Sequence, residues 1–106
     1  ESILQGVIRE TLEETGYTFT PQWLLGIYRW HSPVNDTTYL RFTFLGTAIC
    51  HDHNRKLDKG IVRAAWFHTN EIYELAHRHR SPMVIKCIED HLAGKRYPLE
   101  LLTYYD

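Results

Sequence analysis

The chain has 106 residues, of which 43% are hydrophobic and 24% are charged, and this composition is that of a soluble globular domain with one core. Its net charge of -1 gives no reason to expect nucleic-acid binding, and no apolar run approaches the roughly eighteen residues that a membrane helix needs. Two cysteines without a CxxC pair favour reduced thiols and a cytoplasmic protein. We therefore expect residues 1–106 to form a single domain, whose oligomeric state the sequence leaves open.

The first predicted element is a helix over residues 2–15, because apolar residues recur there at every fourth position. The recurring residues are Leu4, Ile8 and Leu12. We expect this stripe to be buried against the rest of a complete domain, and to be partly exposed in a chain that lacks the strands before it. Gly16 follows directly, and a glycine at that place is typical of a helix end.

Three carboxylates crowd one face of the same helix, since Glu10, Glu13 and Glu14 stand at spacing i, i+3, i+4. Like charges at that spacing destabilise a helix by roughly 0.2–0.5 kcal/mol, and acidic groups in the last turn also oppose the macrodipole. A bound cation would remove this cost, whereas a solvated acidic face without a ligand is the alternative. Clustered glutamate oxygens select a hard divalent cation, so the pattern predicts Mg²⁺, with Mn²⁺ as a common substitute. Mg²⁺ is usually bound by a few carboxylates together with substrate phosphates. The pattern therefore favours attack of a metal-activated water on phosphorus.

Two strands are expected next. Residues 23–30 are rich in aromatic and β-branched side chains, and residues 39–50 are mostly apolar or β-forming. The second run lacks strict alternation, which predicts a strand buried on both faces. The residues between the runs, 32–36, have turn chemistry, so we expect the two strands to form a hairpin.

The following segment is polar and reads as a loop over residues 51–59, after which residues 62–67 are predicted to form a third strand. His51 and His53 lie in the loop and could bind zinc, although they lack a matching pair of ligands.

Two helices are expected in the last third of the chain. A short one ends near residue 75, with Thr69 or Asn70 as its cap. A longer one starts at Ser81, which a proline follows, and ends near Gly94. The tail, residues 96–100, is predicted to be irregular.

The first seventeen residues resemble the Nudix box, written G-x5-E-x7-R-E-U-x-E-E-x-G-U, where U is a bulky apolar residue. The matching residues are Glu1, Arg9-Glu10, Glu13-Glu14 and Gly16-Tyr17. Thr11 stands where an aliphatic residue is usual, and the opening Gly would lie six residues before Glu1. The resemblance implies an α/β fold of the Nudix type. We therefore expect an α/β/α sandwich with a mixed sheet whose N-terminal strands are missing from this chain.

The same resemblance implies roles for the residues of the box. The residues that match Glu13 and Glu14 bind metal in Nudix hydrolases, and the one that matches Glu10 binds metal or acts as a base. The residue that matches Arg9 orients carboxylates, and it commonly holds the one that matches Glu1. Arg9 also has Glu13 at i+4, so local geometry permits that pair as well. Our candidate catalytic residues are therefore Arg9, Glu10 and Glu13, and the candidate metal ligands are Glu10, Glu13 and Glu14.

The substrate side is less clear from the sequence. Trp30 could stack on a heteroaromatic ring, or it could simply pack in the core. Arg29 and Arg41 suit bidentate contact with phosphate, or they are solvent-facing strand residues. Some family members recruit a further acidic residue, as a metal ligand or base, from the region before the third strand, and Asp58 is the candidate here.

Most of the chain also resembles the NudJ-type phosphatases within the Nudix superfamily. The residues that carry this likeness are Trp30 with Pro33 and Leu40-Arg41-Phe42, then Arg80-Ser81-Pro82 with Val84, and Arg96-Tyr97-Pro98-Leu99-Glu100. The likeness implies an enzyme that releases phosphate from nucleoside di- and triphosphates or from thiamine-pathway pyrophosphates. One alternative is a nucleoside-diphosphate-sugar or ADP-ribose pyrophosphatase. The other is a non-catalytic ligand-binding domain of the Nudix type.

Overall fold

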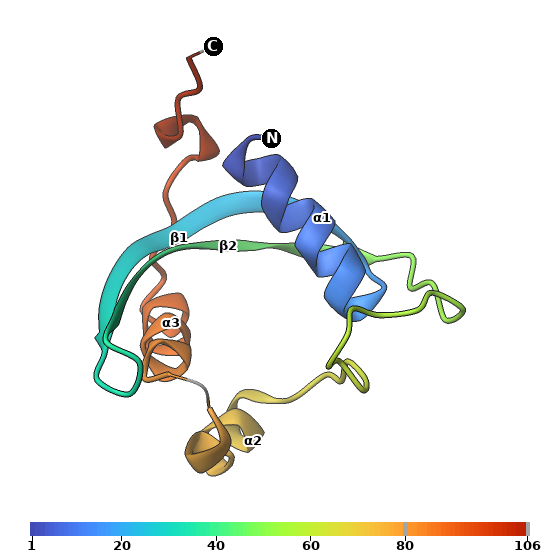
Figure 1. Cartoon of the computed structure of the whole chain (residues 1–106). Helices are drawn as coiled ribbons and strands as arrows, with labels where there is room; N and C mark the ends of the chain where they lie inside the picture. The colour runs from blue at the N-terminus through green and yellow to red at the C-terminus, as the bar shows by residue number, and fades with distance from the viewer. Residues whose placement is uncertain (80, 106) are drawn as a thin grey trace.

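The structure, a computed structural model, describes residues 1–79 and 81–105; Arg80, quoted above, lies outside the described residues. The chain has a mixed α/β fold in which helices pack on a curved two-stranded sheet in the described part (Figure 1). In chain order the elements are α1 (Ile3–Thr15), β1 (Thr18–Ser32), β2 (Thr37–Ile49), α2 (Thr69–Glu74), a 3-10 turn (Ala76–Arg78), α3 (Met83–Leu92) and a second 3-10 turn (Leu99–Leu101). The described part of the chain contains no helix that could span a membrane.

The first helix ends where the sequence predicts and begins one residue later, at Ile3, with Ser2 as its N-cap. At its start the Ser2 hydroxyl accepts a hydrogen bond from the Gln5 backbone N–H at 3.1 Å, and the Gln5 side chain accepts one from the Ser2 N–H at 2.8 Å. This reciprocal capping box satisfies two backbone donors that the helix leaves free. At the other end Gly16 adopts a left-handed φ of 78° and donates to the Leu12 carbonyl at 2.9 Å.

The apolar stripe of α1 is only partly buried, as predicted for this chain. Ile8 remains 37% exposed, and no residue of this helix, all of which the structure describes, is buried. The reason is visible in the layering, because α1 crosses only one end of a two-stranded sheet (Figure 1). Among the described residues the buried apolar side chains are Leu24 and Leu25, both in β1.

The predicted hairpin is confirmed, but its first strand is longer than expected. The strands pair antiparallel from Thr18 opposite Ile49 to Ser32 opposite Thr37, whereas the prediction starts the first strand at residue 23. Pro21 explains the difference, since proline cannot donate to a ladder and is expected only at edges or bulges. The register shifts between Pro21 and Trp23, so the strand accommodates the proline at an irregularity.

The two faces of the hairpin carry different helices. The Tyr28 hydroxyl and Thr43 contact α3, and their position in the ladder places Arg41, Trp30 and Tyr39 on the same face. Ala48 points to the opposite face of the sheet from Thr43, because side chains alternate along a strand. It lines a cavity of about 170 Å³ between the sheet and α1, so α1 covers that opposite face. The second strand is therefore covered in part on each side. Our prediction that it is buried on both faces is wrong, because Leu40 is 64% exposed.

Asp90 fastens α3 to the sheet. This carboxylate is buried, accepts a hydrogen bond from the Tyr28 hydroxyl at 2.7 Å, and lies 3.2 Å from Lys86 Nζ and 3.3 Å from Lys95 Nζ. The hydrogen bond from Tyr28 and the two lysines hold the pKa of Asp90 below its usual value, although burial opposes them. Burial and the hydrogen bond to Asp90 raise the pKa of Tyr28. A charge paired in this way is tolerated in the interior.

The last helix begins two residues later than the sequence predicts, with Pro82 rather than Ser81 as its N-cap, and it ends just before Gly94 as predicted. The Ser81 hydroxyl accepts from the Met83 backbone N–H at 3.2 Å, and the helix is assigned over Met83–Leu92. Gly94 takes a left-handed φ of 80° just after it.

In the short helix α2 the N-cap is His68 rather than Thr69 or Asn70, and the Glu71 carboxylate accepts from the His68 N–H at 2.8 Å. The cap prediction is therefore wrong by one residue.

The predicted third strand over residues 62–67 is not formed. Val62 is 95% exposed and Trp66 is 72% exposed. A strand needs a neighbour with which to exchange backbone hydrogen bonds, and among the described residues no segment pairs with this one.

The tail is largely irregular, as predicted, but Tyr97 forms an isolated bridge with Leu24 through hydrogen bonds of 2.8 and 2.9 Å.

Candidate active site

Arg9 links two carboxylates that lie on either side of it in the sequence. Its Nε lies 3.0 Å from both oxygens of Glu1 and its Nη2 lies 2.7 Å from one of them, while its Nη1 donates to Glu13 at 2.9 Å. Both predicted pairs are therefore present. These hydrogen bonds, first that to Glu1 and then that to Glu13, raise the pKa of Arg9, and Arg9 in turn lowers the pKa of Glu1. The fork geometry of a guanidinium suits such a double contact.

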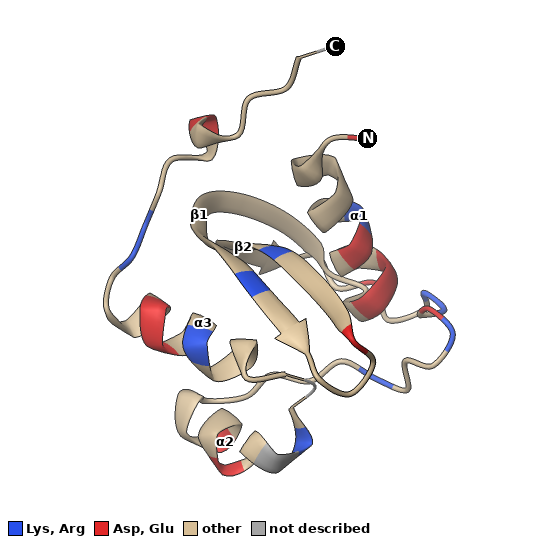
Figure 2. Cartoon of the chain, turned by 60° about the vertical axis from the view of Figure 1, so that its left-hand side comes forward, with Lys and Arg blue, Asp and Glu red and all other residues tan. Residues whose placement is uncertain are grey.

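The three candidate metal ligands lie in the second half of α1, where acidic residues gather in Figure 2. The Glu10 side chain is 61% exposed and reaches Arg9 only at 3.7 Å, whereas Glu13 is 28% exposed. Glu14 is exposed. Within residues 1–79 and 81–105, no three His, Cys, Asp or Glu side chains converge as they would around a metal ion. The donors are nevertheless chemically suited to Mg²⁺, since they are carboxylates on one helix without a thiolate beside them.

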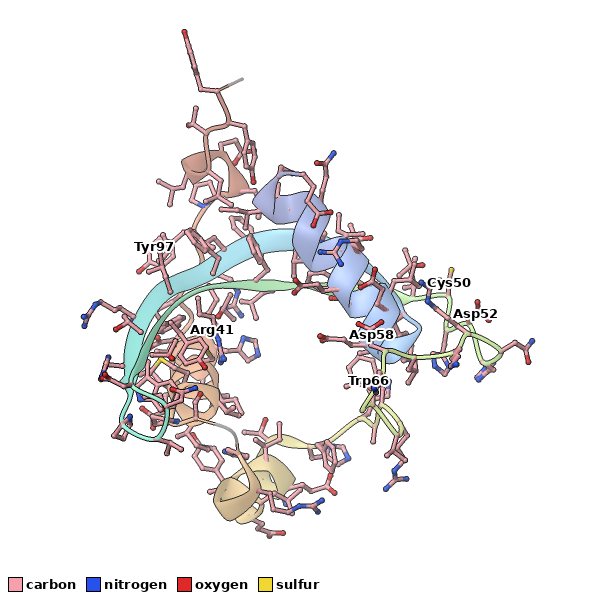
Figure 3. All side chains as sticks on the ribbon, viewed as in Figure 1. Arg41, Cys50, Asp52, Asp58, Trp66 and Tyr97 are labelled. Atoms are coloured by element: carbon pink, nitrogen blue, oxygen red, sulfur yellow. The ribbon has the colours of Figure 1, made fainter. Side chains whose placement is uncertain are left out.

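The loop after β2 folds back on the C-terminal end of α1. The Asp52 N–H donates to the Gly16 carbonyl at 2.9 Å, and the Asp58 N–H donates to the Glu13 carbonyl at 3.0 Å. Figure 3 shows Asp58 beside the last turn of α1. These bonds satisfy carbonyls that a helix leaves without partners at its end. The structure thus brings Asp58 to the same end of the helix as the predicted metal ligands.

The three substrate candidates of the hairpin do not share one surface. Trp30 stacks on Tyr39, with ring centroids 5.9 Å apart and planes 21° from parallel. Arg41 lies on the same face as this pair, on the α3 side of the sheet in Figure 3, whereas Arg29 alternates to the other face. Asp58 is joined to the second half of α1 by a hydrogen bond. Among the described hydrogen bonds, none joins Arg29, Trp30 or Arg41 to that helix.

Aromatic side chains form a cluster around Gly16 that the sequence does not predict. The His51 ring stacks on Tyr17, with centroids 4.4 Å apart, and Trp66 Nε1 donates to the Tyr17 hydroxyl at 2.9 Å. His51 Nε2 lies 3.1 Å from the Thr15 carbonyl oxygen. The one signal in the sequence is the aromatic ring of Tyr17 at a box position where an aliphatic residue is usual. Nothing local to His51 or Trp66 shows that they meet it.

A hollow of about 500 Å³ opens beside this cluster. Its lining runs from the loop at His51 to residue 64 and includes Thr15 of α1. Four cations and two carboxylates take part in that lining: Arg55, Lys56, Lys59 and Arg63, with Asp52 and Asp58. The hollow therefore combines positive charge with access to the end of the acidic helix, which is a chemistry that suits a phosphorylated ligand.

No family model matches the chain. The phosphatase NudJ of Escherichia coli strain K12 is 33% identical over 104 residues, which is 96% of this chain and 65% of that protein. The phosphatase NudJ of Shigella flexneri gives the same identity and the same coverage. The chain thus spans just under two thirds of the length of these curated relatives. A solved structure, a NUDIX hydrolase from Nitrosomonas europaea, is 58% identical with a TM-score of 0.96, over 99% of this chain and 71% of that chain.

Proposed function

Because this chain belongs to the Nudix hydrolase family, we propose that it hydrolyses a phosphoanhydride in a small phosphorylated metabolite or nucleotide with the help of Mg²⁺. The observation that carries the proposal is the double contact of Arg9, which holds Glu1 and Glu13 while Glu10 and Glu14 stay exposed on the same helix. The fold to which these elements belong is, in this proposal, the Nudix α/β/α sandwich with a mixed sheet.

Each residue of the box has a distinct part in this proposal. Glu13 and Glu14 hold the cation, and Arg9 keeps the Glu13 carboxylate in place through its 2.9 Å contact. Glu10 completes the ligand set or accepts a proton from the attacking water. When bound, the cation lowers the pKa of a water molecule and steadies the negative charge that develops on the phosphate oxygens. In this proposal Asp58 serves as an additional acidic ligand or base, and the hydrogen bond from its backbone N–H to the Glu13 carbonyl supports that role.

The substrate-binding part of the proposal concerns the hollow and the hairpin. The loop cations suit the phosphates of the substrate. The stacked pair of Trp30 and Tyr39 suits a heteroaromatic ring, and Arg41 shares its face. Arg29 faces the other side of the sheet, so it and Arg41 serve different surfaces. The NudJ relatives are named phosphatases, which favours free phosphate as a product. As substrates we propose nucleoside di- and triphosphates or thiamine-pathway pyrophosphates.

The test of the reaction is hydrolysis of a panel of these diphosphates and triphosphates in ¹⁸O-labelled water with Mg²⁺, followed by mass spectrometry. We expect the label in orthophosphate. Label confined to a nucleoside monophosphate would instead support an internal pyrophosphatase acting on nucleoside-diphosphate sugars or ADP-ribose. Binding of the same compounds without any turnover would support a ligand-binding domain.

The test of the residues is the Glu14→Gln variant, with Glu89→Gln as its control. Both glutamates are exposed on a helix, but Glu89 lies in α3, away from the box. We expect Glu14→Gln to lose most turnover while its unfolding curve stays close to that of the wild type. Equal activity of the two variants, with Mg²⁺ binding unchanged by calorimetry, would refute the assignment of the metal site.

A further inference from the structure

Two histidines of the loop after β2 face each other through the same ring atom. The Nδ1 atoms of His51 and His53 lie 3.0 Å apart. Their rings are nearly perpendicular, at 85°, with centroids separated by 4.4 Å. Two nitrogens at this distance share a proton, or they can share a metal ion.

The second contact of His51 indicates which ring nitrogen carries a hydrogen. Its Nε2 lies 3.1 Å from the Thr15 carbonyl oxygen, which can only accept a hydrogen bond. The Nε2 of His51 therefore carries a hydrogen, and in the tautomer with that hydrogen alone the Nδ1 lone pair faces His53. In the metal-free pair the Nδ1–H of His53 donates to that lone pair.

We propose that His51 and His53 form a binding site for a transition-metal dication, which we identify as Zn²⁺, held between the two Nδ1 atoms. Zinc–imidazole bonds of roughly 2.0–2.1 Å at a tetrahedral angle place the two nitrogens roughly 3.3 Å apart. The observed 3.0 Å therefore has to open by only a few tenths of an ångström. His53 moves its proton from Nδ1 to Nε2, and both rings bind the ion as neutral ligands. Water or an anionic ligand fills the remaining positions.

The surroundings of His51 are those of an oriented metal ligand. A ligating histidine commonly donates its other ring N–H to a carbonyl, and Thr15 supplies that acceptor here. Tyr17 stacks on the ring at 4.4 Å and is itself held by the hydrogen bond from Trp66. The Thr15 carbonyl belongs to the last turn of α1, where the helix dipole favours a cation.

The site is open to solution and differs in chemistry from the carboxylates of α1. His53 is exposed, and both histidines line the hollow of about 500 Å³ described above. Imidazole nitrogens suit Zn²⁺, Ni²⁺ and Cu²⁺, whereas Mg²⁺ prefers oxygen ligands. A large excess of Mg²⁺ should therefore leave this site available for zinc. This difference allows the site to be measured without reference to catalysis.

The first experiment is calorimetric titration of the full chain with Zn²⁺ in excess Mg²⁺. Wild type is compared with His53→Ala, and with His68→Ala as a matched control at an exposed histidine outside the loop. The His53 side chain is exposed and contacts His51 at the surface. The His53→Ala substitution should therefore leave the fold intact. We expect His53→Ala to weaken zinc binding at least tenfold and His68→Ala to bind like the wild type. Equal binding by all three proteins would overturn the proposal.

The second experiment identifies the atoms that bind. Long-range ¹H–¹⁵N spectra of the histidine rings distinguish Nδ1 from Nε2, and zinc should shift Nδ1 of both His51 and His53. A shift at Nε2 of either ring, or at other histidines only, would contradict the geometry. The Glu14→Gln variant should retain this zinc response. If the proposed hydrolysis were not observed, the zinc result would still stand. If zinc did not bind the two histidines, the proposed hydrolysis would likewise be unaffected.

Discussion

The Tyr28 hydroxyl of β1 donates a 2.7 Å hydrogen bond to the buried carboxylate of Asp90 in α3. The two residues are 62 positions apart in the chain, and the contact joins the last helix to the sheet. Lys86 and Lys95 approach the other oxygen of the same carboxylate. A buried charge that loses one of its partners is costly, so this group should matter more to stability than the exposed ion pairs do.

Replacement of Tyr28 by phenylalanine removes one hydroxyl from this group. Because the carboxylate then loses a buried hydrogen-bond donor, we expect the free energy of unfolding to fall by about 1–3 kcal/mol. Urea denaturation followed by circular dichroism measures the change. Tyr73→Phe is the control, since Tyr73 is 40% exposed on α2 and should show little effect. Equal stability of the two variants would show that the Tyr28 contact is not a stabilising one.

The lowered pKa of Asp90 predicts how stability depends on pH. The folded pKa lies below the unfolded value of about 3.9, so the unfolded chain binds more protons in the interval between the two. The contribution of Asp90 is therefore present above the unfolded pKa and is lost as the pH falls through the folded pKa. Denaturant titrations at pH values above and below about 4 measure this loss as a fall in the free energy of unfolding. The Asp90→Asn variant should give a flatter acid limb than the wild type, and an identical limb would contradict the assignment.

Features that depend on neighbouring residues were predictable from the sequence. Ser2 and Gly16 delimit α1, and Ser81 and Gly94 delimit the last helix, because each acts through hydrogen bonds or dihedral angles within a few positions. The Arg9–Glu13 pair follows from helical spacing in the same way.

Features that depend on distant residues were not predictable. The early start of β1 needs a register irregularity at Pro21, and burial in the hairpin depends on which helix covers which face. Segment 62–67 has the sequence of a strand but no partner among the described residues, so propensity alone gives the wrong answer. The meeting of Tyr17 with His51 joins positions that carry no shared pattern.

A substitution at Arg9 tests whether its double contact serves the reaction. Arg9→Lys keeps the positive charge but cannot contact Glu1 and Glu13 with the same planar fork. Because the contacts are solvent-exposed, we expect little change in stability. We expect turnover to fall at least tenfold and the Mg²⁺ concentration for half-maximal activity to rise. The exposed Arg78→Lys serves as the control, and unchanged kinetics of Arg9→Lys would contradict the positioning role.

Gly16 and Gly94 provide a matched pair for measuring how tightly the loop packs on α1. Both follow a helix in the left-handed region, with φ of 78° and 80°. An alanine at either position therefore has the same backbone penalty of about 1–2 kcal/mol. The surroundings differ, because a Cβ at Gly16 would lie 3.0 Å from the Asp52 carbonyl oxygen and 3.1 Å from the His51 ring, whereas a Cβ at Gly94 would meet none of the described residues within 4 Å.

We expect Gly16→Ala to destabilise the chain more than Gly94→Ala, since it must also push the loop away from the helix. The movement should lengthen the hydrogen bond from Asp52 to the Gly16 carbonyl, so the Asp52 amide should exchange with deuterium faster in that variant. It should also weaken the zinc response of His51, because the ring shifts relative to the Thr15 carbonyl. If the two variants were equally stable and the Asp52 amide equally protected, the loop would not be packed against Gly16 as the structure has it.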